Sequence, residues 1–340
     1  MQIERQVPLL PYTTFRMGCS AAYFAKLGSV QDVEEYARFA RSNNMPLILL
    51  GGGSNSIFPS EGELAACVGK IDIQGFEIIS EGEKNTVLKV GAGENWDNVV
   101  ERTVALGLSG LEALSMIPGS AGATVVQNVG AYGTEIAQVL IELEAFDLAT
   151  DNLSTIPASL CGFSYRNSKF KGEWKGKYAI TSITLTLSKL PPQVPSYPGV
   201  EAYFAKRGIK EPTLKEIRNA IMEIRHAKLP DPAEVASCGS FFKNPIVSKK
   251  EAEAILAKYP QAVHFDTPEG VKFAAGWMLD ELGFKGKTFG RVGVYPNNAL
   301  VLVNLGGATR DELKETVSLI QAGVLEAFGV HLAPEVVWIA

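Results

Sequence analysis

The chain has 340 residues, 46% of them hydrophobic and 20% charged, which is ordinary globular composition and long enough for two or three packed units. Its formal net charge of −5 argues against a nucleic-acid backbone as the main partner, because nucleic-acid binders usually carry a basic excess on one face. No apolar run approaches the roughly 20 residues that cross a membrane. We therefore expect neither a nucleic acid nor a membrane as partner.

The cysteines and the first residues indicate a compartment. No C-x-x-C pair occurs, and no cysteine stands at metal-ligand spacing from a histidine, so we expect reduced thiols and no metal. Glu4 and Pro8 interrupt the stretch where a signal peptide would be apolar. These features predict a cytoplasmic protein.

The first predicted helix starts at Ser29, because Ser29 and Asp32 resemble a capping pair and apolar residues follow at helical spacing. A buried strand is predicted at 46–50, and it runs directly into Gly51-Gly52-Gly53-Ser54-Asn55. Pro59 then prevents a long helix. The pattern is a strand and a glycine loop without the helix of a Rossmann unit.

A second strand, at 86–90, leads to Gly91-Ala92-Gly93 and a predicted helix over 96–106. Another glycine-rich stretch occupies 117–133, and strands are predicted at 139–147 and 178–187. In the last of these, apolar residues suggest the period-2 pattern of a sheet with one buried face. The first 190 residues are expected to be α+β and rich in loops.

The densest proline and glycine cluster lies at 191–199 and predicts a linker. Beyond it, three capping-box patterns each predict the start of a helix: Thr213 with Glu216, Ser248 with Glu251, and Thr309 with Glu312. The apolar tail at 334–339 predicts a short strand that returns to the first domain. The second half is expected to be a smaller domain of helices and strands.

Three glycine-rich loops in one domain favour a large nucleotide cofactor, because glycines let the backbone approach a ligand and free N–H groups can hold a pyrophosphate. The Walker pattern fails, since no Gly-Lys-Ser/Thr follows, and the dinucleotide fingerprint fails in spacing and in its missing helix. Gly91, Gly93 and Gly133 are equally compatible with simple turns.

Several motifs in a specific order resemble UDP-N-acetylenolpyruvoylglucosamine reductase, a flavoenzyme family of the vanillyl-alcohol-oxidase type. They are Thr14-Phe15-Arg16-Met17-Gly18, the 51–55 loop, the stretches 117–123 and 127–133, Tyr165-Arg166-Asn167-Ser168, 239–245, and Pro334-Glu335-Val336. The sequence departs at Thr13, where the family usually has Asn. The resemblance covers nearly the whole chain.

The resemblance implies an α+β fold with a two-part FAD-binding domain of the vanillyl-alcohol-oxidase (PCMH) type and a smaller α+β substrate-binding domain. It places FAD-binding subdomains at 1–65 and 66–190, a linker at 191–210, the substrate-binding domain at 211–330 and a returning strand at 331–340. FAD is expected to bind noncovalently, with its pyrophosphate against 51–55 and 117–124. The residues expected to line it are Gly52, Gly53, Ser54, Asn55, Ser120, Gly122, Ala123 and Tyr132.

The implied reaction is NADPH-dependent reduction of UDP-N-acetylglucosamine enolpyruvate to UDP-N-acetylmuramate for peptidoglycan. A hydride passes from NADPH to FAD and then from flavin N5 to the methylene carbon, and the resemblance makes Ser240 the donor of the proton to the adjacent carbon. Arg166 matches the family arginine, which would stabilise the growing carboxylate charge, and Glu335 matches the family glutamate. Without the resemblance, the residues alone favour a structural role for each of the three: a surface or salt-bridge residue for Arg166, a strand entry for Glu335 and a turn for Ser240.

The UDP-sugar is expected to contact five residues of the second half: Tyr197, Arg225, Lys228, Lys243 and Asn244. Tyr197 would close over the diphosphate as a lid. NADPH and the sugar nucleotide would use one cleft in turn, in a protein that is expected to be a monomer.

Two rival functions stay open at this point. An oxidase or dehydrogenase of the same flavin fold could act on an alcohol or hydroxy acid, since fold alone permits it. A nucleotide-binding protein without turnover could also keep the scaffold, although the motifs around Arg166, Ser240 and Glu335 argue against it.

Overall fold

The structure is a computed structural model that describes residues 1–340 and divides into two compact units. Unit 1 consists of Met1–Val7, Ala21–Gly53 and Glu63–Arg225, and unit 2 of Pro8–Ser20, Ser54–Gly62 and His226–Ala340. Each unit therefore combines segments that are far apart in the sequence.

Unit 1 contains two main sheets. The four-stranded sheet has the order β1-β2-β5-β3, with β1 (Glu4–Pro8), β2 (Ser20–Leu27), β5 (Glu63–Ile71) and β3 (Leu47–Leu50), and β3 runs parallel to β5. The five-stranded antiparallel sheet has the order β11-β10-β12-β7-β6, with β11 (Asn152–Pro157), β10 (Leu140–Asp147), β12 (Tyr178–Ser188), β7 (Asn85–Gly91) and β6 (Phe76–Glu81). A small hairpin joins β8 (Gly130–Ala131) to β9 (Thr134–Glu135).

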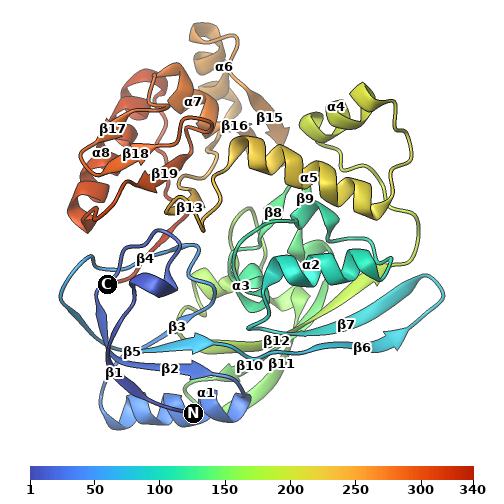
Figure 1. Ribbon diagram of the computed structural model, residues 1–340. Helices are drawn as coiled ribbons and strands as arrows, with labels where there is room; N and C mark the ends of the chain where they lie inside the picture. Colours follow the sequence, from blue (N-terminus) through green and yellow to red (C-terminus); the bar gives the residue numbers. More distant parts are fainter. The chain divides into compact units, whose positions relative to one another are not determined.

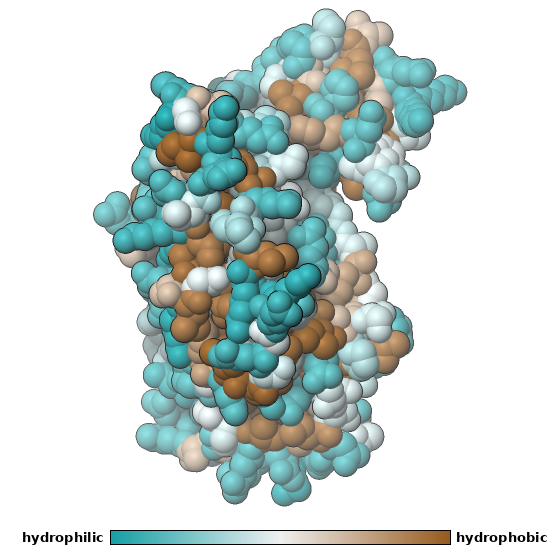
Figure 2. All heavy atoms as spheres, turned by 90° about the vertical axis from the view of Figure 1, so that its right-hand side faces the viewer, coloured by the Kyte–Doolittle hydropathy of each residue, from teal (hydrophilic) through white to brown (hydrophobic).

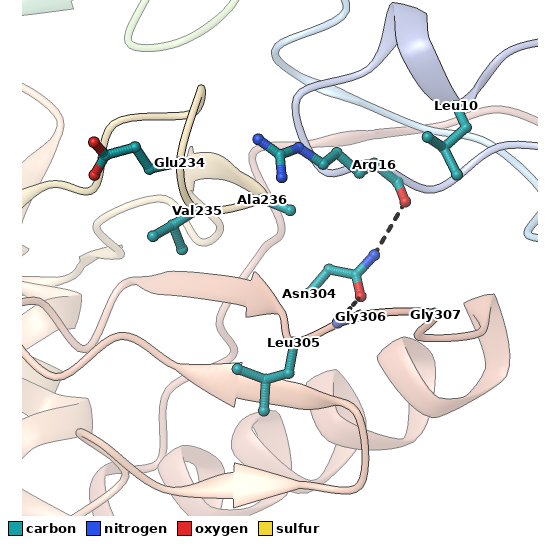
Figure 3. Close-up of a pocket in the computed structure, with 9 residues that line it drawn as sticks. All are labelled: Leu10, Arg16, Glu234, Val235, Ala236, Asn304, Leu305, Gly306 and Gly307. Atoms are coloured by element: carbon teal, nitrogen blue, oxygen red, sulfur yellow. Dashed lines mark hydrogen bonds between the residues drawn. The ribbon is translucent and has the colours of Figure 1, made fainter.

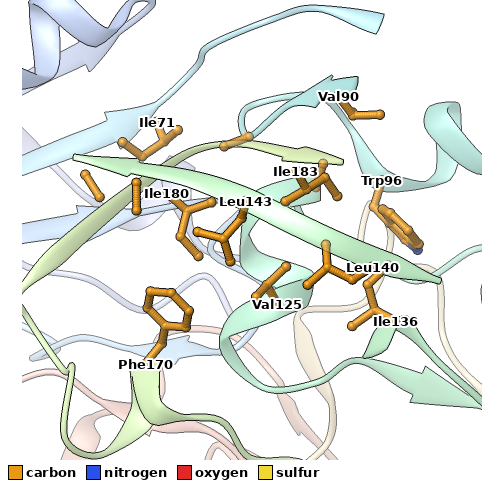
Figure 4. Close-up of a cluster of buried hydrophobic side chains, with 14 of the residues drawn as sticks. Ile71, Val90, Trp96, Val125, Ile136, Leu140, Leu143, Phe170, Ile180 and Ile183 are labelled. Atoms are coloured by element: carbon orange, nitrogen blue, oxygen red, sulfur yellow. The ribbon is translucent and has the colours of Figure 1, made fainter. Parts of the chain in front are cut away.

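The helices of this part are α1 (Val30–Ser42), α2 (Trp96–Ala105), α3 (Ala121–Val126), α4 (Pro198–Arg207) and α5 (Leu214–Lys228), which ends in unit 2. The predicted start of α1 is confirmed, because the Ser29 side chain accepts a hydrogen bond from the Asp32 N–H. One large buried apolar cluster includes residues of α1, α2 and α3, and a separate smaller one joins α4 to α5. In Figure 4, Leu143 and Ile183 of the five-stranded sheet lie close to Val125 of α3.

Unit 2 is built around a four-stranded antiparallel sheet. Its order is β13-β19-β18-β17, with β13 (Ser237–Ser240), β19 (Val301–Asn304), β18 (Val292–Val294) and β17 (Thr288–Phe289). A three-stranded sheet contains β14 (Ile246–Val247), β16 (Gly270–Phe273) and β15 (His264–Thr267). The helices are α6 (Lys249–Lys258), α7 (Ala275–Glu281) and α8 (Arg310–Phe328).

The C-terminal strand of unit 2 pairs with an early segment of the chain. β20 (Val337–Trp338) runs parallel to β4 (Ser56–Ile57), and Figure 1 shows the red C-terminal end beside the blue β4. Five short 3-10 helices complete the list of elements: Leu10–Tyr12, Glu112–Leu114, Ile136–Gln138, Ala158–Leu160 and Lys169–Lys171. The tail predicted at 334–339 is thus a strand, although only two of its residues form the ladder.

Strand β12 corrects the predicted pattern of 178–187. We expected one buried face, but residues on both faces of β12 are buried. The buried residues include Thr181 and Ser182, whose hydroxyls donate to the carbonyl and the carboxylate of Glu144, respectively. Small hydrogen-bonded side chains can be buried as readily as apolar ones.

The predicted linker also differs from expectation, because residues 198–207 form α4. Pro198 begins the helix, where its fixed φ is favourable and its missing N–H is not needed. Val200 and Phe204 are four residues apart and are buried against α5, and Gly208 ends the helix with a left-handed φ of 67°.

No helix of the structure is long and apolar enough to cross a membrane. On the face shown in Figure 2, hydrophobic residues (brown) are interspersed with hydrophilic ones (teal). Exposed large hydrophobic residues such as Leu106 and Leu160 are scattered along the sequence. Singly exposed side chains of this kind are common in globular proteins.

Candidate active site

Two glycine-rich segments of unit 1 pack backbone against backbone. A Cβ atom added to Gly52 would lie 2.6 Å from the Cα of Gly119, and one added to Gly51 would lie 2.5 Å from the Oγ of Ser120. The backbone contact leaves no room for a side chain at Gly52, and a side chain at Gly51 would require Ser120 to move. The loop after β3 and the segment before α3 therefore require glycine to lie side by side.

The donors of this region fit an anionic group. The N–H groups of Gly52 and Gly53 donate no hydrogen bond within unit 1. Ser120 is the N-cap residue of α3, but its hydroxyl does not cap the helix. Unused N–H groups in a glycine loop are suited to phosphate oxygens, so the predicted pyrophosphate site passes this chemical test.

The structure gives Gly91 and Gly93 a packing role. A Cβ on Gly91 would lie 2.4 Å from the carbonyl oxygen of Ile73, and one on Gly93 would lie 2.4 Å from the carbonyl carbon of Asp72. Gly133 has a φ of 83°, which favours glycine in a turn. The sequence left open whether these glycines contact the cofactor or serve turns. Turn geometry and backbone packing are enough to explain Gly91, Gly93 and Gly133.

Arg166 lies in a tight turn of unit 1. The backbone N–H groups of Ser164 and Asn167 each donate to the other's carbonyl, at 3.1 Å. Arg166 itself adopts a left-handed φ of 51°, and its guanidinium donates to the carbonyl of Gly130. This contact fixes the arginine beside the 127–133 segment.

Asn128 supports that turn from inside the unit. Its side chain is buried, and its amide donates to the Glu135 carboxylate at 2.7 Å and to the Ser164 carbonyl at 3.1 Å. Its amide oxygen accepts from the N–H of Ala137. One buried amide thus joins three chain segments around Arg166.

Tyr132, Tyr197 and Arg225 meet in unit 1. The rings of Tyr132 and Tyr197 are edge to face with their centroids 5.2 Å apart. Burial raises the pKa of the Tyr132 hydroxyl and outweighs the opposite effect of the Arg225 guanidinium beside it, so Tyr132 stays protonated at neutral pH. A residue predicted to line FAD therefore contacts two residues predicted to bind the UDP-sugar.

Ser240 and Glu335 lie on paired segments of unit 2. The N–H of Glu335 donates to the carbonyl of Phe241 at 2.7 Å, and the N–H of Lys243 donates to the carbonyl of Ala333 at 2.9 Å. Gly239 has a φ of 69° at an irregularity in β13, which re-aims the following residue. The fold of unit 2 thus places Ser240 and Glu335 on adjacent strands of backbone.

The segment after the glycine loop joins the same part of unit 2. The Asn55 amide donates to the carbonyl of Glu335 at 3.3 Å, and the N–H of Val337 donates to the carbonyl of Asn55 at 2.9 Å. Asn55 therefore supports the backbone on which Glu335 is carried.

A separate cleft of unit 2, of about 430 Å³, contains none of the predicted site residues. Figure 3 shows Arg16 and Asn304 on its wall. The Arg16 guanidinium donates to the carbonyls of Pro232 and Ala233, and the Asn304 amide donates to the carbonyls of Phe15 and Arg16. These polar groups hold the N-terminal segment in place.

Two regions of the chain match known domain families. Residues 21–156 match the FAD binding domain, and residues 231–339 match the UDP-N-acetylenolpyruvoylglucosamine reductase, C-terminal domain. Curated proteins called UDP-N-acetylenolpyruvoylglucosamine reductase from Flavobacterium johnsoniae and Ralstonia nicotianae are 40% and 39% identical to the chain, over 99% and 98% of both sequences respectively. The chain belongs to the UDP-N-acetylenolpyruvoylglucosamine reductase family.

The fold expected from the resemblance is confirmed. A crystal structure of UDP-N-acetylenolpyruvylglucosamine reductase from Thermus caldophilus is 24% identical and matches 100% of both chains with a TM-score of 0.70. The chain has the α+β fold of this reductase family, with an FAD-binding domain of the vanillyl-alcohol-oxidase type and a smaller C-terminal domain.

The sixteen residues predicted for the reductase site divide between the two units. Unit 1 carries Gly52, Gly53, Ser120, Gly122, Ala123, Tyr132, Arg166, Tyr197 and Arg225, whereas unit 2 carries Ser54, Asn55, Lys228, Ser240, Lys243, Asn244 and Glu335. Within unit 2, the Asn244 side chain accepts from the N–H of Ala275 at the start of α7. Asn244 thus has a helix-capping contact that the sequence did not predict.

The departure from the family motif at Thr13 has a local explanation. Thr13 is buried, and its hydroxyl donates to the carbonyls of Leu10 and Met17, at 3.3 and 3.1 Å. The threonine thus stabilises its own turn in unit 2.

Sequence reasoning missed two groups of supporting residues. Asn128 lies inside a quoted family motif, but only the structure shows that its amide supports Arg166. The second group is Asp97 and Arg218: the Arg218 guanidinium donates two hydrogen bonds to the Asp97 carboxylate, at 2.6 and 2.9 Å. The seven-residue spacing of Arg218 and Arg225, which places them on one face of α5, was the available signal.

Proposed function

We propose that this chain is an FAD-dependent enzyme that reduces UDP-N-acetylglucosamine enolpyruvate to UDP-N-acetylmuramate in peptidoglycan precursor synthesis, with NADPH as hydride donor. The observation that carries the proposal is full-length similarity to reductases of that name at about 40% identity. The proposed enzyme acts as a monomer on small molecules.

The cofactor would lie against the packed glycine segments of unit 1. The free N–H groups of Gly52 and Gly53 and the hydroxyl of Ser120 would bind its pyrophosphate, while Gly122 and Ala123 continue the same wall. A Cβ on Gly122 would lie 2.6 Å from that of Ala92, so this wall excludes larger residues. FAD, when bound, supplies the hydride transfer from NADPH to the methylene carbon of the substrate.

Arg166 would stabilise the substrate carboxylate. Hydride addition to the enolpyruvyl methylene moves negative charge onto that carboxylate, and a guanidinium offers several donors for it. The contact of Arg166 with the Gly130 carbonyl supports this role, because it restrains the side chain before the substrate binds.

Ser240 would donate the proton to the carbon next to the carboxylate. A hydroxyl is a weak acid, but a carbon-centred enolate is basic enough to take its proton when the two are held in contact. Glu335, on the neighbouring segment of backbone, would act in a protonated or a paired form, because a bare carboxylate would repel the substrate.

Arg225 has a buried donor available for the UDP-sugar. Its Nη2 donates to the carbonyl of Met116, whereas its Nε is buried without a hydrogen-bond partner. A buried donor of this kind requires an acceptor, and a diphosphate oxygen would supply one. Tyr197, Lys228, Lys243 and Asn244 are the other proposed contacts of the sugar nucleotide.

The two half-reactions can be tested separately. The purified protein is expected to show a flavin absorption band, to lose it when NADPH is added without oxygen, and to regain it when UDP-N-acetylglucosamine enolpyruvate follows. Bleaching without recovery would rule out the proposed substrate, and a protein that takes up no flavin would refute the whole proposal.

Ser240→Ala is expected to leave flavin reduction by NADPH unchanged and to slow reoxidation by the enolpyruvyl substrate, because only the second half-reaction needs the proton. General acids contribute on the order of 100-fold or more, so a loss of that size is expected in stopped-flow measurements. Ser237→Ala, in the same strand, is the matched control. Reoxidation of Ser240→Ala at the normal rate would disprove the assignment.

A further inference from the structure

Met116 adopts an unusual backbone conformation beside the proposed cofactor segment. Its φ is 56°, in the left-handed region that residues other than glycine, asparagine and aspartate rarely enter. It directly precedes 117–124, which the proposed function assigns to the FAD pyrophosphate. Some contact must therefore stabilise Met116 in this state.

Asp97 binds the N–H side of Met116. One carboxylate oxygen of Asp97 accepts from the Met116 N–H at 2.6 Å. The same carboxylate accepts two hydrogen bonds from the Arg218 guanidinium, whose side chain is buried. Burial alone would raise the pKa of Asp97, but the bonds from Arg218 and Met116 hold it below its ordinary value, so it is charged at neutral pH.

Arg225 binds the carbonyl side of the same residue. Its Nη2 donates to the Met116 carbonyl at 3.1 Å. Both polar groups of the Met116 backbone are thus held by charged side chains, and both arginines come from one face of α5.

The chain around Asp97 also hydrogen-bonds to the residues that follow Met116, toward the proposed cofactor site. The N–H of Trp96 donates to the carbonyl of Gly119, and the N–H of Ala121 donates to the carbonyl of Glu94. Glu94 and Trp96, at the start of α2, therefore hold the segment 119–121 by backbone hydrogen bonds. A shift at Met116 would reach Gly119 and Ser120.

We propose that Asp97, Arg218 and Arg225 are positioning residues that clamp Met116 in its left-handed conformation and thereby set the geometry of the segment 117–123 for FAD. The inference rests on the proposed function for the identity of the ligand. It adds residues that would contact no FAD themselves but fix the backbone that does.

The first experiment measures FAD binding by the apoprotein of Arg218→Met, using quenching of flavin fluorescence. Loss of the two hydrogen bonds between Arg218 and Asp97 should weaken FAD binding about tenfold, as expected when a charged hydrogen-bonded pair is broken. Arg207→Met is the matched control, because Arg207 pairs with Glu223 of α5 at an exposed site and does not contact Met116. Equal FAD affinity in the two variants would overturn the proposal.

The second experiment separates backbone positioning from a general loss of structure. Met116→Asn in the Arg218→Met background should recover most of the FAD affinity, because asparagine enters the left-handed region more readily than methionine. A merely structural role for Arg218 predicts no recovery from this change. Absence of recovery would therefore contradict the clamp.

Hydrogen exchange of the amides at 116–122 tests the clamp without any flavin. Exchange should be faster in Arg218→Met than in Arg207→Met, and equal rates would refute the clamp. If Arg218→Met does not fold, Asp97→Asn, which keeps the shape of the side chain, takes its place in both experiments. Failure of the wild-type protein to bind FAD would count against the proposed function, whereas the exchange rates would still decide on the clamp.

Discussion

Four of the eight non-glycine residues with a left-handed backbone lie in the part of unit 1 that the candidate site uses. Met116, Asn128, Tyr132 and Arg166 all have positive φ without being glycine. Such conformations cost free energy and persist only where surrounding contacts stabilise them. The hydrogen bonds of Asp97, Arg225 and Asn128 supply those contacts here.

Asn128→Ala is expected to destabilise unit 1 by about 1–3 kcal/mol, because it removes a buried amide that joins three segments and leaves their polar groups without it. Urea unfolding would measure the loss. Asn43→Ala is the control, since Asn43 is exposed and its amide makes one bond, to the carbonyl of Phe39.

Reoxidation of the reduced flavin by substrate should slow in Asn128→Ala as well, because the turn of Arg166 loses its support. Unchanged stability together with unchanged reoxidation would show that Asn128 has no part in positioning Arg166.

The residues of the site could be predicted only in part. The order of the motifs was enough to identify Arg166, Ser240 and Glu335 as candidates, because a family resemblance carries residues over one by one. The supports of these residues were not predicted: no local pattern indicates that Asn128 reaches Ser164, 36 residues away, or that Asp97 reaches Arg218, 121 residues away.

Helix starts were the most predictable elements. All three expected capping boxes are present, at Thr213, Ser248 and Thr309, because the hydrogen bonds that make a box are local in sequence. Strands were less predictable: β12 was assigned one buried face because its buried hydroxyls look like solvent-facing positions. Helix α4 was missed although Pro198, Val200, Phe204 and Gly208 together signal a short helix.

The capping box of α8 gives a pH-dependent prediction. Hydrogen bonds from Arg291, together with the N–H of Thr309, lower the pKa of Glu312 to about 2 from its usual 4.5. A carboxylate with a lowered pKa stabilises the folded state above its unfolded pKa and loses that effect as the pH falls. Glu312→Gln should therefore lower the thermal midpoint at pH 7, and the difference from wild type should shrink between pH 4.5 and about 2.

Glu315→Gln is the control for that experiment, because Glu315 is exposed on the same helix. Thermal unfolding at pH 7, 4 and 3 would measure the difference between each variant and the wild type. A difference for Glu312→Gln that stays constant with pH would contradict the role of its charge.

At the scale of the whole molecule, the two units are interleaved along the chain. We predicted contiguous ranges, from 1–65 to 331–340, because composition changes mark linkers but do not show which segments pack together. The structure groups Pro8–Ser20 and Ser54–Gly62 with His226–Ala340. Their packing depends on long-range contacts such as those of Phe15 and Ile57 in the core of unit 2.

The pairing of β20 with β4 gives a prediction for this arrangement. Val337→Pro removes the N–H that donates to the Asn55 carbonyl, so unit 2 should lose on the order of 3 kcal/mol of stability. Ala340→Pro is the control, because Ala340 is exposed and lies beyond the ladder. Scanning calorimetry would compare the two, and equal unfolding temperatures would show that the closing strand adds no stability.

The interleaving also has a consequence for the order in which the chain folds during synthesis. A ribosome has made all of unit 1 once it passes Arg225, whereas unit 2 lacks β20 until residue 338 has been added. Phe15 and Ile57, which are buried in the finished unit 2, leave the ribosome early and must wait for partners from 226–340. The nascent chain is therefore exposed to aggregation through Phe15 and Ile57 until the residues after 226 have been made.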